Sequence, residues 1–234
     1  MALLIDMHCH TGWGSGDSHT DPNLLIRQAM LYGLDALCVT EHNQVWNLSK
    51  LERLAEKYEF RIFPGVEIDT DFGHVLVYGL NEPKRWSQFP TVFELRRLVD
   101  KVDGAMILAH PFRKRERPAD DDLEQGEARI VLERELREEA VTLFDGIEMY
   151  NGLASPRERL LSGALAEALE RPMSGGSDTH RHPEVGATFT VFEDDIQNVR
   201  QLITAIQSGR MRGGDWHSEK IPDRRRDLMM SRHS

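Results

Sequence analysis

Asp6-Met7-His8-Cys9-His10-Thr11 is the stretch of this chain that says most about its fold and its chemistry. It directly follows the apolar residues 2–5, which predict a first β-strand. Side chains two residues apart on a strand point to the same side, so His8 and His10 share a face with Asp6. Two imidazoles with a carboxylate behind them predict half of a metal site, in which Asp6 is a candidate acceptor that fixes an imidazole tautomer.

Length and composition indicate a single domain. The chain has 234 residues, of which 40% are hydrophobic, enough to bury one large core. We expect a barrel domain over residues 1–215 and a charged, disordered tail over residues 216–234. The net charge of -10 argues against long nucleic acid or an anionic membrane as a partner. Two cysteines, no signal-peptide pattern and no apolar stretch of membrane-spanning length predict a cytoplasmic protein.

Apolar runs alternate with helical patterns along most of the chain. Helices are predicted at residues 22–33, 48–58, 91–102, 125–140, 156–170 and 194–207, and strands at residues 34–39, 61–68, 74–80, 105–109, 146–152, 172–177 and 187–192. This order predicts parallel strands with right-handed crossovers, hence the α/β class and a distorted (βα)7 TIM-like barrel. Residues 69–73 are too few for a parallel crossover, so the next strand is predicted to turn back antiparallel and to place His74 beside Glu67.

Polar residues stand at the carboxyl ends of these strands, where barrel enzymes carry their working groups. The strand-end residues are His8, His10, His42, Glu67, His110, Asp178 and His180. Residues 113–122 form a charged loop, and residues 125–140 a helix rich in Glu and Arg. This charged run is interpreted as a solvated helix face; a partner surface and a mobile flap near the site are the alternatives.

The motifs at these strand ends resemble the PHP family, the polymerase and histidinol phosphatase family of metal-dependent phosphoesterases. The matching motifs are Asp-Met-His-Cys-His-Thr at 6–11, Thr-Glu-His-Asn at 40–43, Gly-Val-Glu-Ile at 65–68, Leu-Ala-His-Pro at 108–111 and Gly-Ser-Asp-Thr-His at 176–180. The resemblance implies a distorted seven-stranded barrel that binds two or three divalent metal ions.

The resemblance also implies which residues bind the ions. A first ion would use His8, His10, Glu67 and Asp178, a second Asp17, His42 and His180, and a third Glu67, His74 and His110. Asp17 stands further from the paired histidines than is usual in the family, so His19 is a competing ligand. Glu41 stands where aspartate is common, and it is either a support for the ligands or a solvent-facing acid.

The chemistry of these ligands is that of a hydrolase. Imidazole and carboxylate ligands suit Mn, Zn or Fe. Two such ions can lower the pKa of a shared water and supply hydroxide, so no side-chain nucleophile is required. Arg113 and Arg181 are the candidate substrate-binding residues, because a guanidinium can hold a phosphate, and surface solvation is the alternative for both. Trp13 either stacks on a base or ring of the substrate or covers the mouth of the barrel.

The sequence therefore predicts a phosphatase that acts on a small phosphomonoester. A nuclease or nucleotide phosphodiesterase using the same site is one alternative, and a non-catalytic metal-binding PHP module is another. An amidohydrolase also opens on His-x-His, but its bridging residue is usually a lysine, whereas the corresponding strand here ends in Glu67. The sequence leaves open the identity of the substrate, the metals, their number and the oligomeric state.

Overall fold

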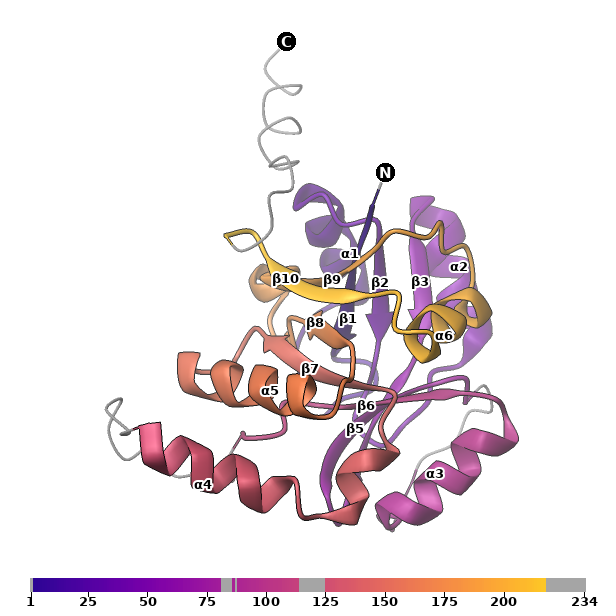
Figure 1. The fold of residues 1–234 in the computed structure, drawn as a ribbon. Helices are drawn as coiled ribbons and strands as arrows, with labels where there is room; N and C mark the ends of the chain where they lie inside the picture. The colour runs from indigo at the N-terminus through magenta and orange to yellow at the C-terminus, as the bar shows by residue number, and fades with distance from the viewer. Residues whose placement is uncertain (1, 81–85, 87, 114–124, 218–234) are drawn as a thin grey trace.

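The computed structural model of this protein describes residues 2–80, 86, 88–113 and 125–217. Its strands form two five-stranded sheets, in the orders β10-β9-β1-β2-β3 and β4-β5-β6-β7-β8 (Figure 1). The predicted α/β class is confirmed. The strands do not form one continuous sheet, so the (βα)7 barrel stays a prediction. Residues 218–234 of the predicted tail and residues 114–122 of the charged loop lie outside the described residues.

The elements follow the predicted order along the chain. The first sheet consists of β1 (Leu3–Cys9), β2 (Ala36–Val39), β3 (Arg61–Pro64), β9 (Thr188–Phe192) and β10 (Arg212–Asp215). The second consists of β4 (Val66–Thr70), β5 (Gly73–Tyr78), β6 (Ala105–Leu108), β7 (Gly146–Asn151) and β8 (Met173–Gly176). The helices are α1 (Pro22–Leu31), α2 (Leu48–Tyr58), α3 (Val92–Lys101), α4 (Gln125–Glu135), α5 (Pro156–Ala168) and α6 (Val199–Gln207), with short 3-10 helices at Glu139–Leu143 and His182–Glu184.

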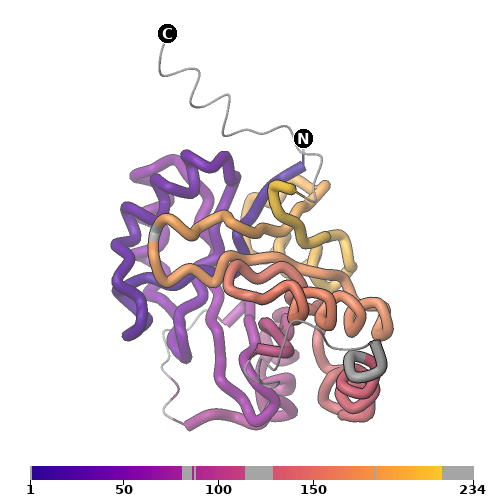
Figure 2. The backbone as a smooth tube through the Cα atoms, turned by 90° about the vertical axis from the view of Figure 1, so that its left-hand side faces the viewer, coloured from indigo at the N-terminus to yellow at the C-terminus, as the bar shows by residue number. Residues whose placement is uncertain are grey.

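Three features differ from the sequence prediction. The predicted strand at residues 61–68 is divided at Gly65 into β3 and β4, which belong to different sheets. The helix predicted over residues 125–140 ends at Glu135 and is followed by a 3-10 turn. Strand β10, which the sequence did not predict, pairs antiparallel with β9, and β9 in turn pairs antiparallel with β1. The last described part of the chain thus returns to the sheet that contains the first strand (Figure 2).

The short turn after β4 has the predicted effect. Strand β5 pairs antiparallel with β4, and His74 lies opposite Asp69, two residues from Glu67. A turn of two residues can join only antiparallel neighbours, since a parallel pair needs a crossover of about a dozen residues. His74 therefore enters the site from a strand that runs in the direction opposite to β4.

Backbone contacts join the two sheets where the ligand-bearing strands end. The N–H of Asp178 donates to the carbonyl of His8 at 2.7 Å, and the N–H of His10 donates to the carbonyl of Thr179 at 3.1 Å. On the other side, His42 and Glu67 form a parallel bridge. The end of β1 thus lies against the residues after β8, and the segment after β2 lies against β4.

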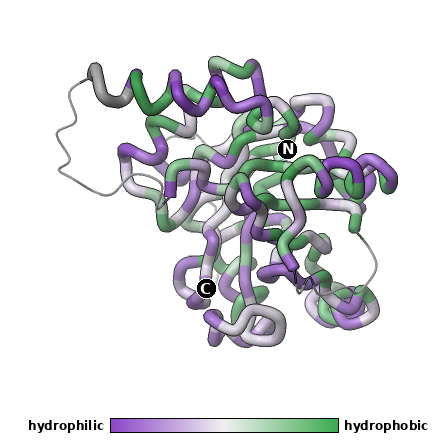
Figure 3. The backbone as a smooth tube through the Cα atoms, turned by 90° about the horizontal axis from the view of Figure 1, so that it is seen from below, coloured by the Kyte–Doolittle hydropathy of each residue, from purple (hydrophilic) through white to green (hydrophobic). Residues whose placement is uncertain are grey.

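Helices with one apolar face cover this framework. Helix α1 begins at the cap Asp21 with Pro22 in its first turn, and α3 and α5 each begin with a capping box. Hydrophobic and hydrophilic residues alternate along the outer helices in Figure 3, as expected for helices with one face on the core. Among the described residues, no helix combines the length and the apolar character needed to cross a membrane.

Gly176, the last residue of β8, provides a test of the close contact between β8 and β1. A Cβ atom at this position would lie 2.4 Å from the Cβ of His8 and 2.6 Å from its backbone N. We expect Gly176→Ala to lower the free energy of unfolding by about 1–3 kcal/mol, because the overlap involves backbone that has to shift. Urea unfolding would measure the difference. Gly16→Ala is the matched control, since nothing lies within 4 Å of that position, and equal stability of the two variants would contradict the contact.

Candidate metal centre

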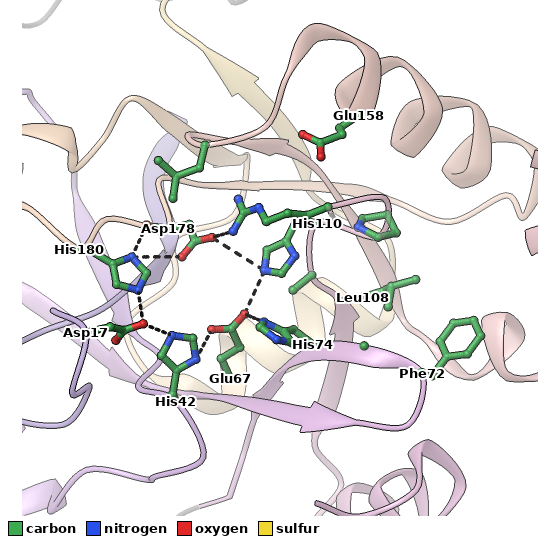
Figure 4. A pocket seen from close by; sticks show the side chains of 15 residues that line it. Asp17, His42, Glu67, Phe72, His74, Leu108, His110, Glu158, Asp178 and His180 are labelled. Carbon is green, nitrogen blue, oxygen red and sulfur yellow. Dashed lines mark hydrogen bonds and ion pairs between the residues drawn. The ribbon is translucent and has the colours of Figure 1, made fainter. Parts of the chain in front are cut away.

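The predicted metal-binding side chains meet at one end of the two sheets, around Glu67 (Figure 4). They come from β1, β4 and β5, from the segments after β2, β6 and β8, and from the loop after β1. All nine predicted residues lie in this group: His8, His10, Asp17, His42, Glu67, His74, His110, Asp178 and His180. The structure therefore brings together residues that are spread over most of the chain.

The buried part of the cluster is the first predicted ligand set. The Nε2 atoms of His8 and His10 lie 3.1 Å apart. Glu67 Oε2 lies 3.3 Å from the first of these nitrogens and 3.2 Å from the second. Asp178 Oδ1 lies 3.5 and 3.2 Å from the same two atoms. Two imidazole nitrogens and two carboxylate oxygens thus point to one place.

The second predicted set lies nearer to solvent. Asp17 Oδ2 is 3.3 Å from His42 Nε2 and 3.2 Å from His180 Nε2. The rings of His42 and His180 stack with the ring of His10, at centroid distances of 4.3 and 4.5 Å. His19 is exposed and does not belong to any of the ligand groups found in the described part of the chain. Asp17, and not His19, is the residue that faces these histidines.

The third predicted set shares the other oxygen of Glu67. His74 Nδ1 lies 2.8 Å from Glu67 Oε1, and His110 Nε2 lies 3.0 Å from the same atom. The second nitrogen of His74 faces Asp69 Oδ1 at 3.3 Å. Glu67 is therefore common to the first and third sets, as the resemblance implied.

The chemistry of the donors fits a divalent cation. Glu67 is fully buried, and its Oε2 accepts no hydrogen bond of good geometry within the described residues, although three imidazoles surround it. A buried acceptor without a hydrogen bond is costly, and a cation would satisfy it together with the nitrogens of His8 and His10 that face each other. Imidazole and carboxylate donors in such a group are those of Zn, Mn and Fe sites.

Glu148 orients the ligands, a role that the sequence did not assign to it. Its Oε1 lies 3.0 Å from His8 Nδ1, and its Oε2 accepts from the N–H of His110 at 2.9 Å and from Asn151 Nδ2 at 3.0 Å. A carboxylate on the second ring nitrogen fixes the tautomer that leaves Nε2 free for a metal. Asp6, expected in this role, instead accepts from the backbone N–H groups of residues 8, 177 and 186. The available sequence signal for Glu148 was its place near the end of a predicted strand.

Glu41 supports the loop after β1. It is fully buried and accepts hydrogen bonds from the N–H and hydroxyl of Thr11, from the hydroxyl of Ser15 and from Trp46 Nε1. The hydroxyl of Ser15 also lies 3.1 Å from His10 Nδ1. Of the two interpretations of Glu41, the structure favours support of a ligand.

Electrostatic coupling inside the cluster shifts the pKa values of its members in opposite directions. Burial alone would lower the pKa of His10, but its close contacts with the carboxylates of Asp178 and Glu67 raise it from 6.5 to about 9. Burial alone would raise the pKa of Glu67, but the charge of His8 and the close contacts with His10 and other imidazoles hold it well below its usual value. Without metal, protons on the imidazoles therefore balance the carboxylates.

Two of the ligand positions have an unusual backbone conformation. His110 has φ 28° and Asp178 has φ 52°, in the left-handed region that residues other than glycine seldom adopt. The contacts of the surrounding strands hold both residues there, including the bond from the N–H of His110 to Glu148. Such local strain is typical of functional sites.

A cavity of about 560 Å³ opens over the cluster (Figure 4). Arg113 lies in it, where its guanidinium donates to Asp178 Oδ2 and Asn151 Oδ1. Arg181 is exposed and is not among the described residues that line the cavity. Of the two arginines predicted to bind substrate, Arg113 is the one that the structure places beside the ligands.

Comparisons with known proteins agree with the motifs. Residues 156–211 match the family model described as PHP-associated. Over 119 residues, 50% of this chain, the sequence is 25% identical to an error-prone DNA polymerase of Symbiobacterium thermophilum, of which the match covers 11%.

Two solved structures show the same fold. One is a two-domain protein from Bacteroides vulgatus containing a predicted PHP-like metal-dependent phosphoesterase, with a TM-score of 0.66, 20% identity, and coverage of 92% of this chain and 65% of that one. The other is PsfC from Pseudomonas syringae, with a TM-score of 0.61, 20% identity, and coverage of 99% and 96%. This chain therefore spans about a tenth of the polymerase and about two thirds of the two-domain protein.

The fold and the cluster define an α/β protein with a histidine-rich group of side chains that could hold divalent metal ions. The matched family model covers residues 156–211, and together with the shared fold it supports the resemblance to the PHP family that the strand-end motifs indicate.

Metal binding is expected to release protons from the cluster. Because the pKa of His10 is raised to about 9, and that of His8 is also raised, both rings carry protons at neutral pH that a metal ion must displace. Protein freed of metal by a chelator would be titrated calorimetrically with Zn²⁺ at pH 7.5, in two buffers of different ionisation enthalpy. The titration should show that the protein releases about one proton or more when Zn²⁺ binds. Apparent affinity should rise from pH 6 to pH 9. Metal binding without proton release, or independent of pH, would contradict the charge balance.

Proposed function

We propose that this protein hydrolyses a phosphate ester, namely a small phosphomonoester, with water activated by two or three divalent ions. The observation that carries the proposal is the environment of Glu67. Its Oε2 faces three imidazoles, those of His8, His10 and His42, and its Oε1 faces two more. The likeness to a protein containing a predicted PHP-like metal-dependent phosphoesterase supports the class of reaction.

The residues of the chain would hold the ions in the three sets described above. Divalent ions bound there, which we propose to be Mn, Zn or Fe, would activate a water as the nucleophile and neutralise charge on the phosphoryl group. The protein contributes orientation. Glu148 fixes the ring of His8, Ser15 fixes that of His10, and Glu41 holds the loop that carries Ser15. None of these groups needs to act as a nucleophile.

Arg113 is the proposed phosphate-binding group. Its guanidinium already contacts two side-chain oxygens in the cavity, those of Asp178 and Asn151. A phosphate entering the cavity offers oxygens of the same kind to the same fork of N–H donors. We propose Arg181 as a second group that meets the substrate from the rim.

The shape of the cavity favours a substrate with a small organic body. At about 560 Å³ it is in the range of small-molecule sites. The lining includes Phe72, Leu108, Pro111 and Leu153, which can cover a hydrophobic or ring-shaped group. The lining also includes proposed metal ligands, among them Glu67, His110 and Asp178, so the substrate would place its phosphate beside these residues.

Two further expectations, on the architecture and on the location of the protein in the cell, accompany this proposal. We infer that the two sheets are parts of one distorted barrel, and the backbone bonds between the end of β1 and the residues after β8 support this. We also infer a cytoplasmic location, in agreement with two buried, unpaired cysteines, Cys9 and Cys38.

Loss of the shared carboxylate should abolish hydrolysis. We expect Glu67→Gln to lower phosphate release by at least about 100-fold, because Glu67 belongs to the first and third sets and also contacts His42 of the second. The measurement is phosphate release from sugar phosphates, histidinol phosphate, nucleotides and short oligonucleotides, with Mn, Zn or Fe. Asp195→Asn is the control, because Asp195 is exposed and belongs neither to the ligand groups nor to the residues that line the cavity. Activity that survives both Glu67→Gln and chelation would overturn the mechanism, and turnover of oligonucleotides alone would favour the nuclease.

Removal of the proposed phosphate-binding group should act mainly on binding. We expect Arg113→Ala to lower kcat/KM by about 10- to 100-fold, chiefly through KM, because a charge-assisted contact with the phosphate is lost. Steady-state kinetics on the best substrate of the panel would measure this. Arg97→Ala on α3, an exposed arginine, is the matched control. An unchanged KM would contradict the role of Arg113.

A further inference from the structure

A second cavity, also about 560 Å³, lies between the loop after β1 and helix α2. It is lined by Trp13, Lys50, Arg53, Leu54 and Lys57, and we call it the basic groove. It contains none of the proposed metal ligands. The groove therefore differs from the metal centre in both its residues and its charge.

Helix α2 separates its charges between two faces. Lys50, Arg53 and Lys57 are spaced so that they share one face, the one that lines the groove. The acidic residues of the segment stand at other positions of the helical period: Glu52, Glu56 and Glu59. A chain with a net charge of -10 thus presents a local row of cations beside an aromatic ring.

Trp13 is an exposed ring that the structure holds in place. It is 52% exposed, yet it stacks on Trp46 with a centroid distance of 5.6 Å and an interplanar angle of 15°. Trp46 is 4% exposed and donates its indole N–H to Glu41 at 2.7 Å. The Nζ of Lys50 lies 5.9 Å from the centroid of the Trp13 ring. A fixed, exposed indole next to cations is the arrangement that binds a base by stacking and its phosphate by charge.

The groove and the metal centre share the residues that hold the loop between them. Glu41 accepts from Trp46 on the groove side and from Ser15 on the side of the metal centre, where Ser15 contacts His10. The same loop carries Trp13 and Asp17. A ligand in the groove would therefore lie on the far side of the loop that supplies one of the proposed metal ligands.

We propose that the basic groove binds a nucleotide, with its base stacked on Trp13 and its phosphate held by Lys50, Arg53 and Lys57. The nucleotide is either free or part of a single strand, since both offer the same base and phosphate. The proposal does not depend on the proposed hydrolysis, because no metal ligand lines the groove. It adds a binding site to the protein beyond the proposed phosphoesterase centre.

The test is binding by the full-length protein, with metal bound and after chelation. Fluorescence anisotropy of a labelled six-nucleotide single strand, with competition by AMP, measures the affinity. We expect binding to persist after chelation. Trp13→Ala should weaken it by about tenfold or more, and Lys50→Glu with Arg53→Glu should weaken it further and reduce its salt dependence. The matched controls, Phe89→Ala and Arg97→Glu with Lys101→Glu, change an exposed aromatic residue and two exposed cations elsewhere and should leave affinity unchanged.

The outcomes distinguish the source of the ligand and the two proposals. Tighter binding of the strand than of AMP, lost in the groove variants, identifies a single strand, and equal binding identifies a free nucleotide. No binding, binding that the groove variants leave unchanged, or binding that chelation abolishes would overturn the basic groove as a nucleotide site. Loss of hydrolysis with intact groove binding, or the reverse, would show that one proposal fails without the other.

Discussion

The burial of Glu67 between imidazoles is the interaction on which the rest of the site depends. A carboxylate removed from water is unfavourable by several kcal/mol unless it is paired. Glu67 is paired from four directions, by histidines that belong to β1, to the segment after β2, to β5 and to the end of β6. The charged form of Glu67 is therefore stable in the protein interior only while these strand ends stay together. The same requirement brings the donors for a metal to one point.

This constraint also explains local features that would otherwise be unfavourable. His110 and Asp178 adopt left-handed backbone conformations, and Gly176 lets β8 approach the backbone of His8. Each feature points a ligand toward Glu67 or allows two ligand strands to come close. The neighbouring strands, which are fixed by ordinary ladder hydrogen bonds, hold these residues in their strained conformations. The unfavourable backbone energy is confined to a few residues, whereas the resulting arrangement of ligands involves the whole cluster.

The sequence predicted which residues form the cluster, but it did not predict which side chains orient them. The strand-end positions of His8, His42, Glu67 and Asp178 followed from apolar runs, and the antiparallel β5 followed from the short turn before it. The break at Gly65 was missed because β3 and β4 form one apolar run. The contact of Glu148 with His8 was missed because periodicity indicates which residues share a strand face, and it does not show which acid meets which imidazole across 140 positions.

The net charge of the whole chain does not describe how charge is distributed over the surface of this protein. A net charge of -10 weighs against a broad surface for nucleic acid, because such a surface needs many cations over a wide area. It says little about a groove only a few residues wide. Helix α2 keeps its acids away from the face that carries Lys50 and Arg53, and Trp13 is held beside that face by its stacking on Trp46. The loop that carries Trp13 thus has an acidic, histidine-rich centre on one side and a cationic groove on the other.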